Sequence, residues 1–365
     1  MPLRQLAAAT LFKKILKMSQ PRSNNQAANG ARSRTVLRYA LPAVAFVFLV
    51  GVMGFRFARS SPLHTSNQIA SQVQATAAKQ RTTATKADSA VTLTPAPKNW
   101  RETTHVHGLA VNPVNPAIAY VATHHGLLQR SESGQWFWMG KPRADYMGFT
   151  AHPTNSNRLY SSGHPPTGGN LGFQISENQG QDWKQISLPG VDFHALAIAP
   201  SDPNIFYGWP ASGAQGLHAS TDGGKTWTKP RMAGLGDAPF SLTVDPHNPD
   251  HVFATTRAGL YESTDRGNNW ALVPSTQDAP VVGLALLKQG DSTVMYGYRV
   301  LKSAPGLYRS ADNGKTWEKL GNNGTSGVIL QLAISSSNPQ ILYAVNQNNA
   351  VFQSQDSGQT WKELG

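Results

Sequence analysis

The chain has no cysteine in its 365 residues. Disulfide bonds, thiolate metal sites and a thiol nucleophile are therefore excluded. Charged residues are also scarce, at 14%, and the second half of the chain lacks the apolar period of an amphipathic helix. What is abundant is glycine and proline, 33 and 24 residues, which is typical of many short strands joined by tight turns.

Acidic residues are nearly absent from the first part of the chain. Residues 1–98 contain 14 Lys and Arg but only one acid, Asp88, whereas residues 99–365 contain 18 Lys and Arg against 19 Asp and Glu. The formal net charge of +12 therefore belongs to the N-terminal segment. Residues 99–365 are nearly neutral, which argues against a nucleic-acid-binding fold.

The N-terminal segment has the pattern of a membrane anchor. Residues 1–38 carry eight basic residues and no acid, and residues 39–55 form an uncharged run of 17 residues. This pattern predicts a cytoplasmic tail (1–38), a single transmembrane signal-anchor (39–56) and a flexible linker (57–98). The protein would then sit in the inner or cytoplasmic membrane, with residues 99–365 on the periplasmic or extracellular side. A cleaved signal peptide is the alternative.

One motif organises the rest of the chain. Ser-x-Asp-x-Gly-x-x-Trp occurs at residues 220–227, 263–270, 310–317 and 354–361; a copy with Asn178 occurs at 176–183 and a shortened copy at 131–136. The repeats are 43 to 47 residues apart, and each has room for four short strands. This array predicts an all-β, six-bladed β-propeller over residues 99–365. Residues 99–103 would form a spare strand that helps to close the ring, or the remnant of a seventh blade.

The motif itself is predicted to be structural. Its acids can accept hydrogen bonds from their own turn, the following glycines can supply a positive φ, and the tryptophans can bury their rings. The residues concerned are Asp222, Asp265, Asp312, Asp356, Trp183, Trp227, Trp270, Trp317 and Trp361.

The motif resembles the Asp-box (BNR) family of propellers. The chain also resembles a family of exported bacterial glycosylhydrolases that are named sialidase-like. This resemblance rests on four short strings, HVHGLA, ATHHGL, YMGF and GHP, at residues 105–110, 122–127, 146–149 and 163–165. The resemblance implies a propeller and a glycoside hydrolase that acts on extracytoplasmic glycans. The Arg-Ile-Pro motif of sialidases does not occur in this sequence, so the resemblance does not carry the sialidase catalytic set.

The strand order that follows from the Asp-box repeat places several histidines at one mouth of the central channel, on the face opposite the Asp-boxes. The predicted ligand- or metal-binding residues there, all from the first three blades, are His105, His107, His124, His125, His164, His194 and Met147. Imidazole with carboxylate is a donor set for zinc or copper. The same groups can instead bind a sugar or an anion, or fill the mouth as hydrogen-bonded structural groups.

Three functions remain open. The first is a membrane-anchored module that binds a ligand, a metal or a protein partner at this mouth. The second is a glycoside hydrolase, for which Asp145 and Asp192 are the candidate carboxylate pair. The third is a scaffold of the assembly-factor kind. Possible substrate contacts in the later blades are Trp209, Arg257, Tyr298 and Arg299.

Overall fold

The computed structural model describes residues 93–141, 143–321 and 324–365. The predicted tail, the predicted membrane segment and most of the linker lie outside these ranges. Within them, no helix is long and apolar enough to cross a membrane. The anchor at residues 39–56 therefore stays a prediction.

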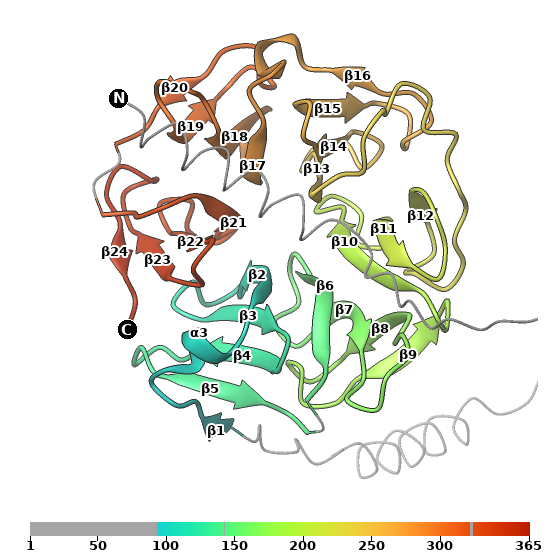
Figure 1. Cartoon of the computed structure of the whole chain (residues 1–365), viewed down its shortest axis with the longest axis vertical. Helices are drawn as coiled ribbons and strands as arrows, with labels where there is room; N and C mark the ends of the chain where they lie inside the picture. Colours follow the sequence, from blue (N-terminus) through green and yellow to red (C-terminus); the bar gives the residue numbers. More distant parts are fainter. Residues whose placement is uncertain (1–92, 142, 322–323) are drawn as a thin grey trace, which may run out of the picture. The chain divides into compact units, whose positions relative to one another are not determined.

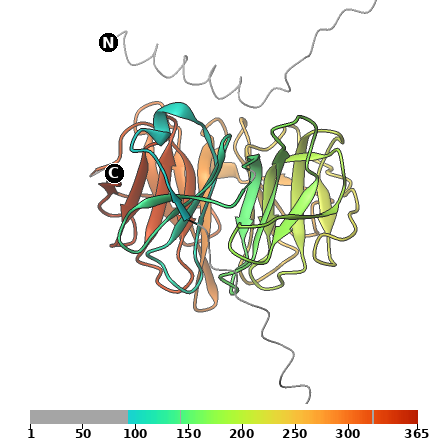
Figure 2. The same ribbon diagram turned by 90° about the horizontal axis from the view of Figure 1, so that it is seen from below.

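The described chain forms six antiparallel sheets arranged in a ring (Figure 1). The first strand of each sheet packs against the first strand of the next, and the sixth sheet contacts the first. Figure 2 shows the same sheets from the side. The predicted six-bladed, all-β propeller is confirmed.

The strands follow the predicted repeat. Blade 1 contains β2 (Val106–Val111), β3 (Ala119–Thr123), β4 (Gly126–Arg130) and β5 (Trp136–Met139). Blade 2 contains β6 (Asp145–Ala151), β7 (Leu159–His164), β8 (Phe173–Ser176) and β9 (Lys184–Ser187). Blade 3 contains β10 (Asp192–Ile198), β11 (Phe206–Ser212) and β12 (His218–Ser220).

The second half of the ring repeats this order. Blade 4 contains β13 (Ser241–Val244), β14 (Val252–Thr255), β15 (Leu260–Ser263) and β16 (Ala271–Leu272), followed by the short helix η1 (Pro274–Thr276). Blade 5 contains β17 (Val281–Gln289), β18 (Ser292–Arg299), β19 (Gly306–Ser310) and β20 (Glu318–Lys319). Blade 6 contains β21 (Ile329–Ile334), β22 (Leu342–Asn346), β23 (Val351–Ser354) and β24 (Lys362–Glu363).

Two details differ from the prediction. Blade 3 has three strands in the described chain, and its fourth position is reduced to an isolated bridge between Ala219 and Thr228. Residues 99–103 do not form a spare strand, because Trp100–Thr103 is a helical turn, α3. The extra strand is instead β1 (Leu93–Pro95), which pairs with β5 at the outer edge of blade 1.

The ring closes without a shared sheet between its ends. The Arg101 guanidinium donates to the backbone carbonyls of Leu364 and Gly365 at 2.8 and 3.0 Å. The Trp136 indole donates to the Gly365 carbonyl at 2.8 Å. Trp100 is buried at this junction, and its ring lies 5.3 Å from the ring of Trp136. Apolar burial and side-chain-to-backbone hydrogen bonds thus join blade 6 to blade 1.

The Asp-box turns have the predicted structural role. In the first full copy, Asp222 accepts hydrogen bonds from the backbone N–H groups of Lys225 and Thr226 and from the Thr226 hydroxyl. These bonds lower the pKa of Asp222 to about 2. Gly224 has a φ of +80°, and its carbonyl accepts from the Trp227 indole at 3.0 Å. The copies at Asp265, Asp312 and Asp356 repeat this geometry.

A buried charge network lies on blade 4, beside the turn between its first two strands. His251 is buried and bonds Asp245 at 3.2 Å through Nδ1 and Glu262 at 3.0 Å through Nε2. Burial opposes the charged imidazolium, but the two carboxylates outweigh it and raise the pKa of His251 to about 9.

This network predicts a loss of stability at alkaline pH. A raised folded-state pKa stabilises the fold fully below the unfolded value, near 6.5, and the contribution disappears as the pH rises through about 9. We expect a loss on the order of 2 kcal/mol between pH 6 and 10, after allowing for solvent screening. Chemical denaturation across this range measures it. His251→Gln should flatten the slope, and His247→Gln, at a half-buried turn residue, should keep it; equal slopes in all three proteins would refute the assignment.

Candidate functional site

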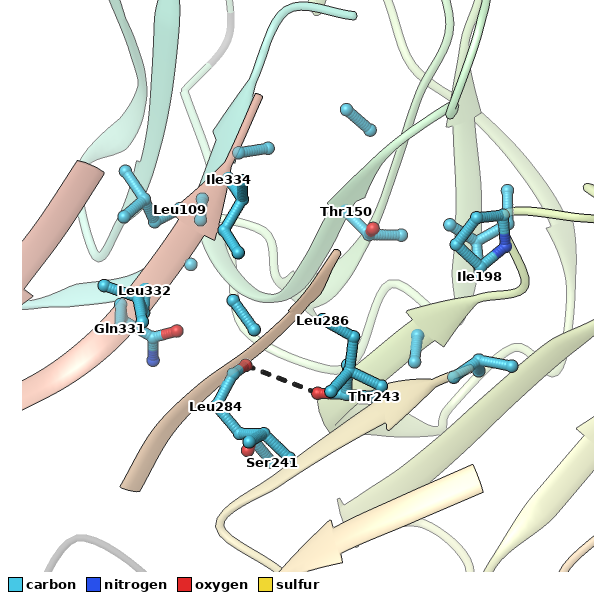
Figure 3. A pocket seen from close by; sticks show the side chains of 18 of the residues that line it. Leu109, Thr150, Ile198, Ser241, Thr243, Leu284, Leu286, Gln331, Leu332 and Ile334 are labelled. Carbon is cyan, nitrogen blue, oxygen red and sulfur yellow. Dashed lines mark hydrogen bonds between the residues drawn. The ribbon is translucent and has the colours of Figure 1, made fainter. Parts of the chain in front are cut away.

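The central channel contains a cavity of about 770 Å³ lined by the first strands of all six blades. Its wall mixes apolar and polar groups, and Leu109, Leu286 and Leu332 are among the apolar ones in Figure 3. Among the polar groups, the Thr243 hydroxyl donates to the Leu284 carbonyl (dashed in Figure 3). His107, Met147 and His194 lie on the lining at the start of β2, β6 and β10. These three residues place the predicted donor groups at one mouth of the channel.

Irregular strand pairing sets the direction of these three side chains. The β2–β3 register shifts between Val106 and Gly108, where His107 lies, and the β10–β11 register shifts between Phe193 and Ala195, where His194 lies. The β6–β7 register shifts between Tyr146 and Phe149, around Met147. A β-bulge redirects a side chain relative to regular alternation. The bulges thus turn the mouth residues out of the inter-blade packing.

The first histidine–aspartate set consists of His107, His124 and Asp145. His124 Nδ1 lies 2.6 Å from Asp145 Oδ2, and its Nε2 lies 3.2 Å from His107 Nε2. Since a carboxylate accepts, His124 donates from Nδ1 to Asp145, and one proton is shared between its Nε2 and the Nε2 of His107. The two imidazoles thus form a hydrogen-bonded chain that ends at an aspartate.

Electrostatics agree with this chain. Burial, assisted by the neighbouring His124, lowers the pKa of His107 to about 3, so this imidazole is neutral. Burial also opposes ionisation of Asp145, but the hydrogen bond from His124 and the surrounding imidazoles outweigh it and lower the pKa of the carboxyl group. Asp145 is therefore an ionised carboxylate, and its side chain is 22% exposed.

The second set consists of His164, Asp192 and His194. His164 Nε2 and His194 Nε2 lie 3.2 and 2.8 Å from the same oxygen, Asp192 Oδ2. The side chain of Asp192 is only 2% exposed, whereas the two imidazoles are 36% and 34% exposed. In each set the donor atoms lie within 4.8 Å of one another, which is compatible with a metal ion.

The two sets are neighbours and are built alike. In each, an aspartate at the start of one blade contacts a histidine at the start of the 2–3 loop of the preceding blade: Asp145 with His124 and Asp192 with His164. Asp145 also pairs with His164 across β6 and β7. His164 helps to lower the pKa of Asp145. The first three blades thus share one continuous polar mouth.

Other predicted mouth residues lie beside the sets. The His105 ring is 5.7 Å from that of His124, and His105 and His125 are both exposed. Met147 is buried in the channel wall. Their predicted roles in binding stay predictions.

The predicted substrate contacts of the later blades do not gather at one place. Tyr298 and Arg299 are buried, and the Arg299 guanidinium donates to the Ser275 carbonyl at 2.6 Å. Trp209 is half-buried and packs on the core cluster of blades 3 and 4. Arg257 is exposed and pairs with Asp237 at 3.3 Å. In this arrangement Arg257 alone of the four offers an exposed charged group to a ligand.

Sequence reasoning missed two groups that position the mouth. The Gly169 carbonyl accepts from His164 Nδ1 at 3.0 Å. The Gln331 amide of blade 6 donates to the backbone carbonyl of His107 at 3.2 Å. Neither contact has a sequence signal, because a backbone carbonyl has no side-chain signature and Gln331 follows His107 by 224 residues in the sequence.

Comparison with known proteins identifies the repeat. Residues 218–229 and 308–319 match the family model described as BNR/Asp-box repeat. The chain is an Asp-box repeat β-propeller. Its Asp-box turns are the ones that the fold places between the third and fourth strands of a blade, away from the histidine mouth.

The curated relatives of this Asp-box propeller are glycoside hydrolases. A probable oligoxyloglucan-reducing end-specific xyloglucanase from Neosartorya fischeri is 27% identical over 197 residues, which cover 47% of this chain and 24% of the relative. A xyloglucanase from Hypocrea jecorina is 26% identical over 190 residues, 50% of this chain and 22% of the relative. The matched part thus spans only about a quarter of these proteins.

Solved structures show the same architecture. The GH74 enzyme from Niastella koreensis has a TM-score of 0.53 at 19% identity, covering 71% of this chain and 45% of that one. This likeness supports the propeller fold. Because the relatives described here carry xyloglucanase names, the sialidase-like resemblance stays a prediction.

Proposed function

We propose that this Asp-box propeller acts on carbohydrate as a glycoside hydrolase-like module, and that its glycan binds at the histidine-rich mouth of blades 1 to 3. The observation that carries the proposal is the Asp145–His124–His107 chain at this mouth, which presents an ionised, partly exposed carboxylate. The match to xyloglucanases over about half of this chain supports carbohydrate as the ligand class.

The roles of the two candidate carboxylates differ. Asp145 is ionised and partly exposed, which suits a base or a nucleophile. Asp192 is buried and holds two partly exposed imidazoles, so it is a positioning residue. Glycoside hydrolysis also needs a proton for the leaving oxygen, and we assign its delivery to His164 or His194, which Asp192 orients.

Glycoside turnover by the full-length chain tests the proposal. We expect release of reducing ends from xyloglucan oligosaccharides or another member of a glycan panel, and Asp145→Asn should lower kcat about 100- to 10,000-fold. Asp291→Asn, in the exposed hairpin turn of blade 5, is the matched control and should leave kcat unchanged. Asp192→Asn should also change the pH profile, because it releases the two imidazoles.

Two outcomes would change the proposal. A glycan that binds at the mouth without turnover would reduce the function to that of a carbohydrate-binding module. The absence of both binding and turnover for every glycan tested would reject it. The predicted membrane tether at residues 39–56 remains part of the proposal, since it would hold the propeller near extracytoplasmic glycans.

A further inference from the structure

The second histidine–aspartate set directs two imidazoles at one buried carboxylate oxygen, Asp192 Oδ2. His164 Nδ1 lies 3.0 Å from the Gly169 carbonyl oxygen. Since a carbonyl only accepts, His164 carries a proton on Nδ1. Its Nε2 faces Asp192 Oδ2, 3.2 Å away. A proton on Nε2 or a bound metal ion can hold these two atoms together, and the three donor atoms of the set lie within 4.8 Å of one another.

The aspartate of this set is unsatisfied. Asp192 is 2% exposed, and no hydrogen-bond partner reaches its Oδ1 atom from the residues that the structure describes. A buried carboxylate with an unpaired oxygen is costly, so a native fold normally supplies a counter-charge. Asp145 Oδ1 of the first set also lacks a partner among the described residues, but there the imidazoles bond each other: His124 donates to Asp145 through Nδ1, and its Nε2 bonds Nε2 of His107.

The donor geometry fits a transition metal. Zinc is bound by histidine nitrogen and aspartate oxygen at about 2.0–2.2 Å in tetrahedral sites, which places neighbouring donors roughly 3.3 Å apart. The two imidazole nitrogens lie 3.2 and 2.8 Å from Asp192 Oδ2. A metal-binding histidine usually donates its other ring proton to a backbone carbonyl or a carboxylate, as His164 does to Gly169.

We propose that His164, His194 and Asp192 bind one divalent transition metal ion of the zinc type. Three protein ligands leave a fourth position open, and the partly exposed imidazoles place that position at the solvent side of the mouth. A water molecule fills it in the free protein. While the metal is bound, the Nε2 atoms of His164 and His194 hold it and carry no proton, so in the metal-loaded protein the metal-bound water would supply the proton for the leaving oxygen, a step that rests on the proposed function.

Metal binding is tested without any sugar. The EDTA-treated full-length chain is titrated with zinc chloride by calorimetry, and with cobalt(II) to read the visible bands of a tetrahedral ion. We expect His164→Gln and His194→Gln each to abolish one bound equivalent and the cobalt bands. His247→Gln, on a turn of blade 4 outside both sets, should retain them. Unfolding temperatures in EDTA report whether the variants fold.

Each outcome decides the inference separately from the proposed function. No zinc bound by the folded parent protein would overturn it, as would uptake that is lost in His107→Gln but kept in His164→Gln. Zinc binding by a chain that cleaves no glycoside would support the metal site and reject the hydrolase. If the chain binds no zinc and cleaves the glycoside equally fast with and without EDTA, the result would reject the metal site and support the hydrolase.

Discussion

Replacing Trp100 by alanine is expected to lower the free energy of unfolding by about 3–5 kcal/mol, the usual cost of deleting a large buried ring. Trp100 is 1% exposed and belongs to the core cluster that contains Trp136 of blade 1 and Leu364 of blade 6. The Arg101 guanidinium lies 4.6 Å from the Trp100 ring and donates to the last two carbonyls of the chain. Loss of the indole therefore weakens the junction on which the closed ring depends.

Urea denaturation of the full-length chain measures this effect. Val114→Ala is the matched control, because Val114 is 66% exposed and its change should stay within about 0.5 kcal/mol. An effect of Trp100→Ala as small as that of the control would show that the ring is closed by other contacts.

Gly163→Ala is expected to have the second large effect, because it combines backbone strain with a direct overlap. Gly163 has a φ of +138° at the point where β7 faces Tyr146 of β6. A Cβ atom there would overlap the carbonyl oxygen of Asp145 and lie 3.0 Å from the Met147 nitrogen. The backbone must therefore move at Asp145, the residue whose side chain is the partly exposed carboxylate of the mouth. We expect a loss of about 3 kcal/mol in stability.

The same substitution should damage the site more than the fold. A shift of Asp145 disturbs its 2.6 Å hydrogen bond with His124, and the neighbouring His164 moves with Gly163. Glycan binding or turnover should therefore fall at temperatures at which the protein is still folded. Gly168→Ala separates strain from overlap, since Gly168 has a φ of +85° but nothing within 4 Å of its Cβ position. Equal effects of the two substitutions would contradict the overlap argument.

The sequence predicted the periodic part of the fold because each Asp-box is a local structure. The acid, the glycine and the tryptophan of Ser220–Trp227 interact within one turn, so their spacing identifies the turn wherever it occurs. The four strands of a blade follow from the same spacing, because each repeat has room for four short strands between one Asp-box and the next. The predicted ring closure was wrong in detail. Residues 99–103 were expected to form a strand, but Trp100–Thr103 is helical and Arg101 contacts the C-terminal end of the chain.

The sequence also placed the histidines and aspartates at the same mouth, because equivalent positions of successive blades lie side by side. It did not decide which of them act together. That depends on bulges at His107 and His194, on an inter-blade contact between His124 and Asp145, and on the Gly169 carbonyl. These are features of pairing register and backbone direction between blades.

By itself, then, the sequence determined the number of blades, the structural face and the residues of the opposite mouth, since all three depend on a short repeated motif. Only the tertiary structure divided the mouth into a hydrogen-bonded chain at Asp145 and a pair of imidazoles that share one oxygen of Asp192. It also placed Arg299 in the interior and His251 between two carboxylates. The reason is physical: a side chain's charge state depends on partners from other strands and blades, and those partners are brought together by folding.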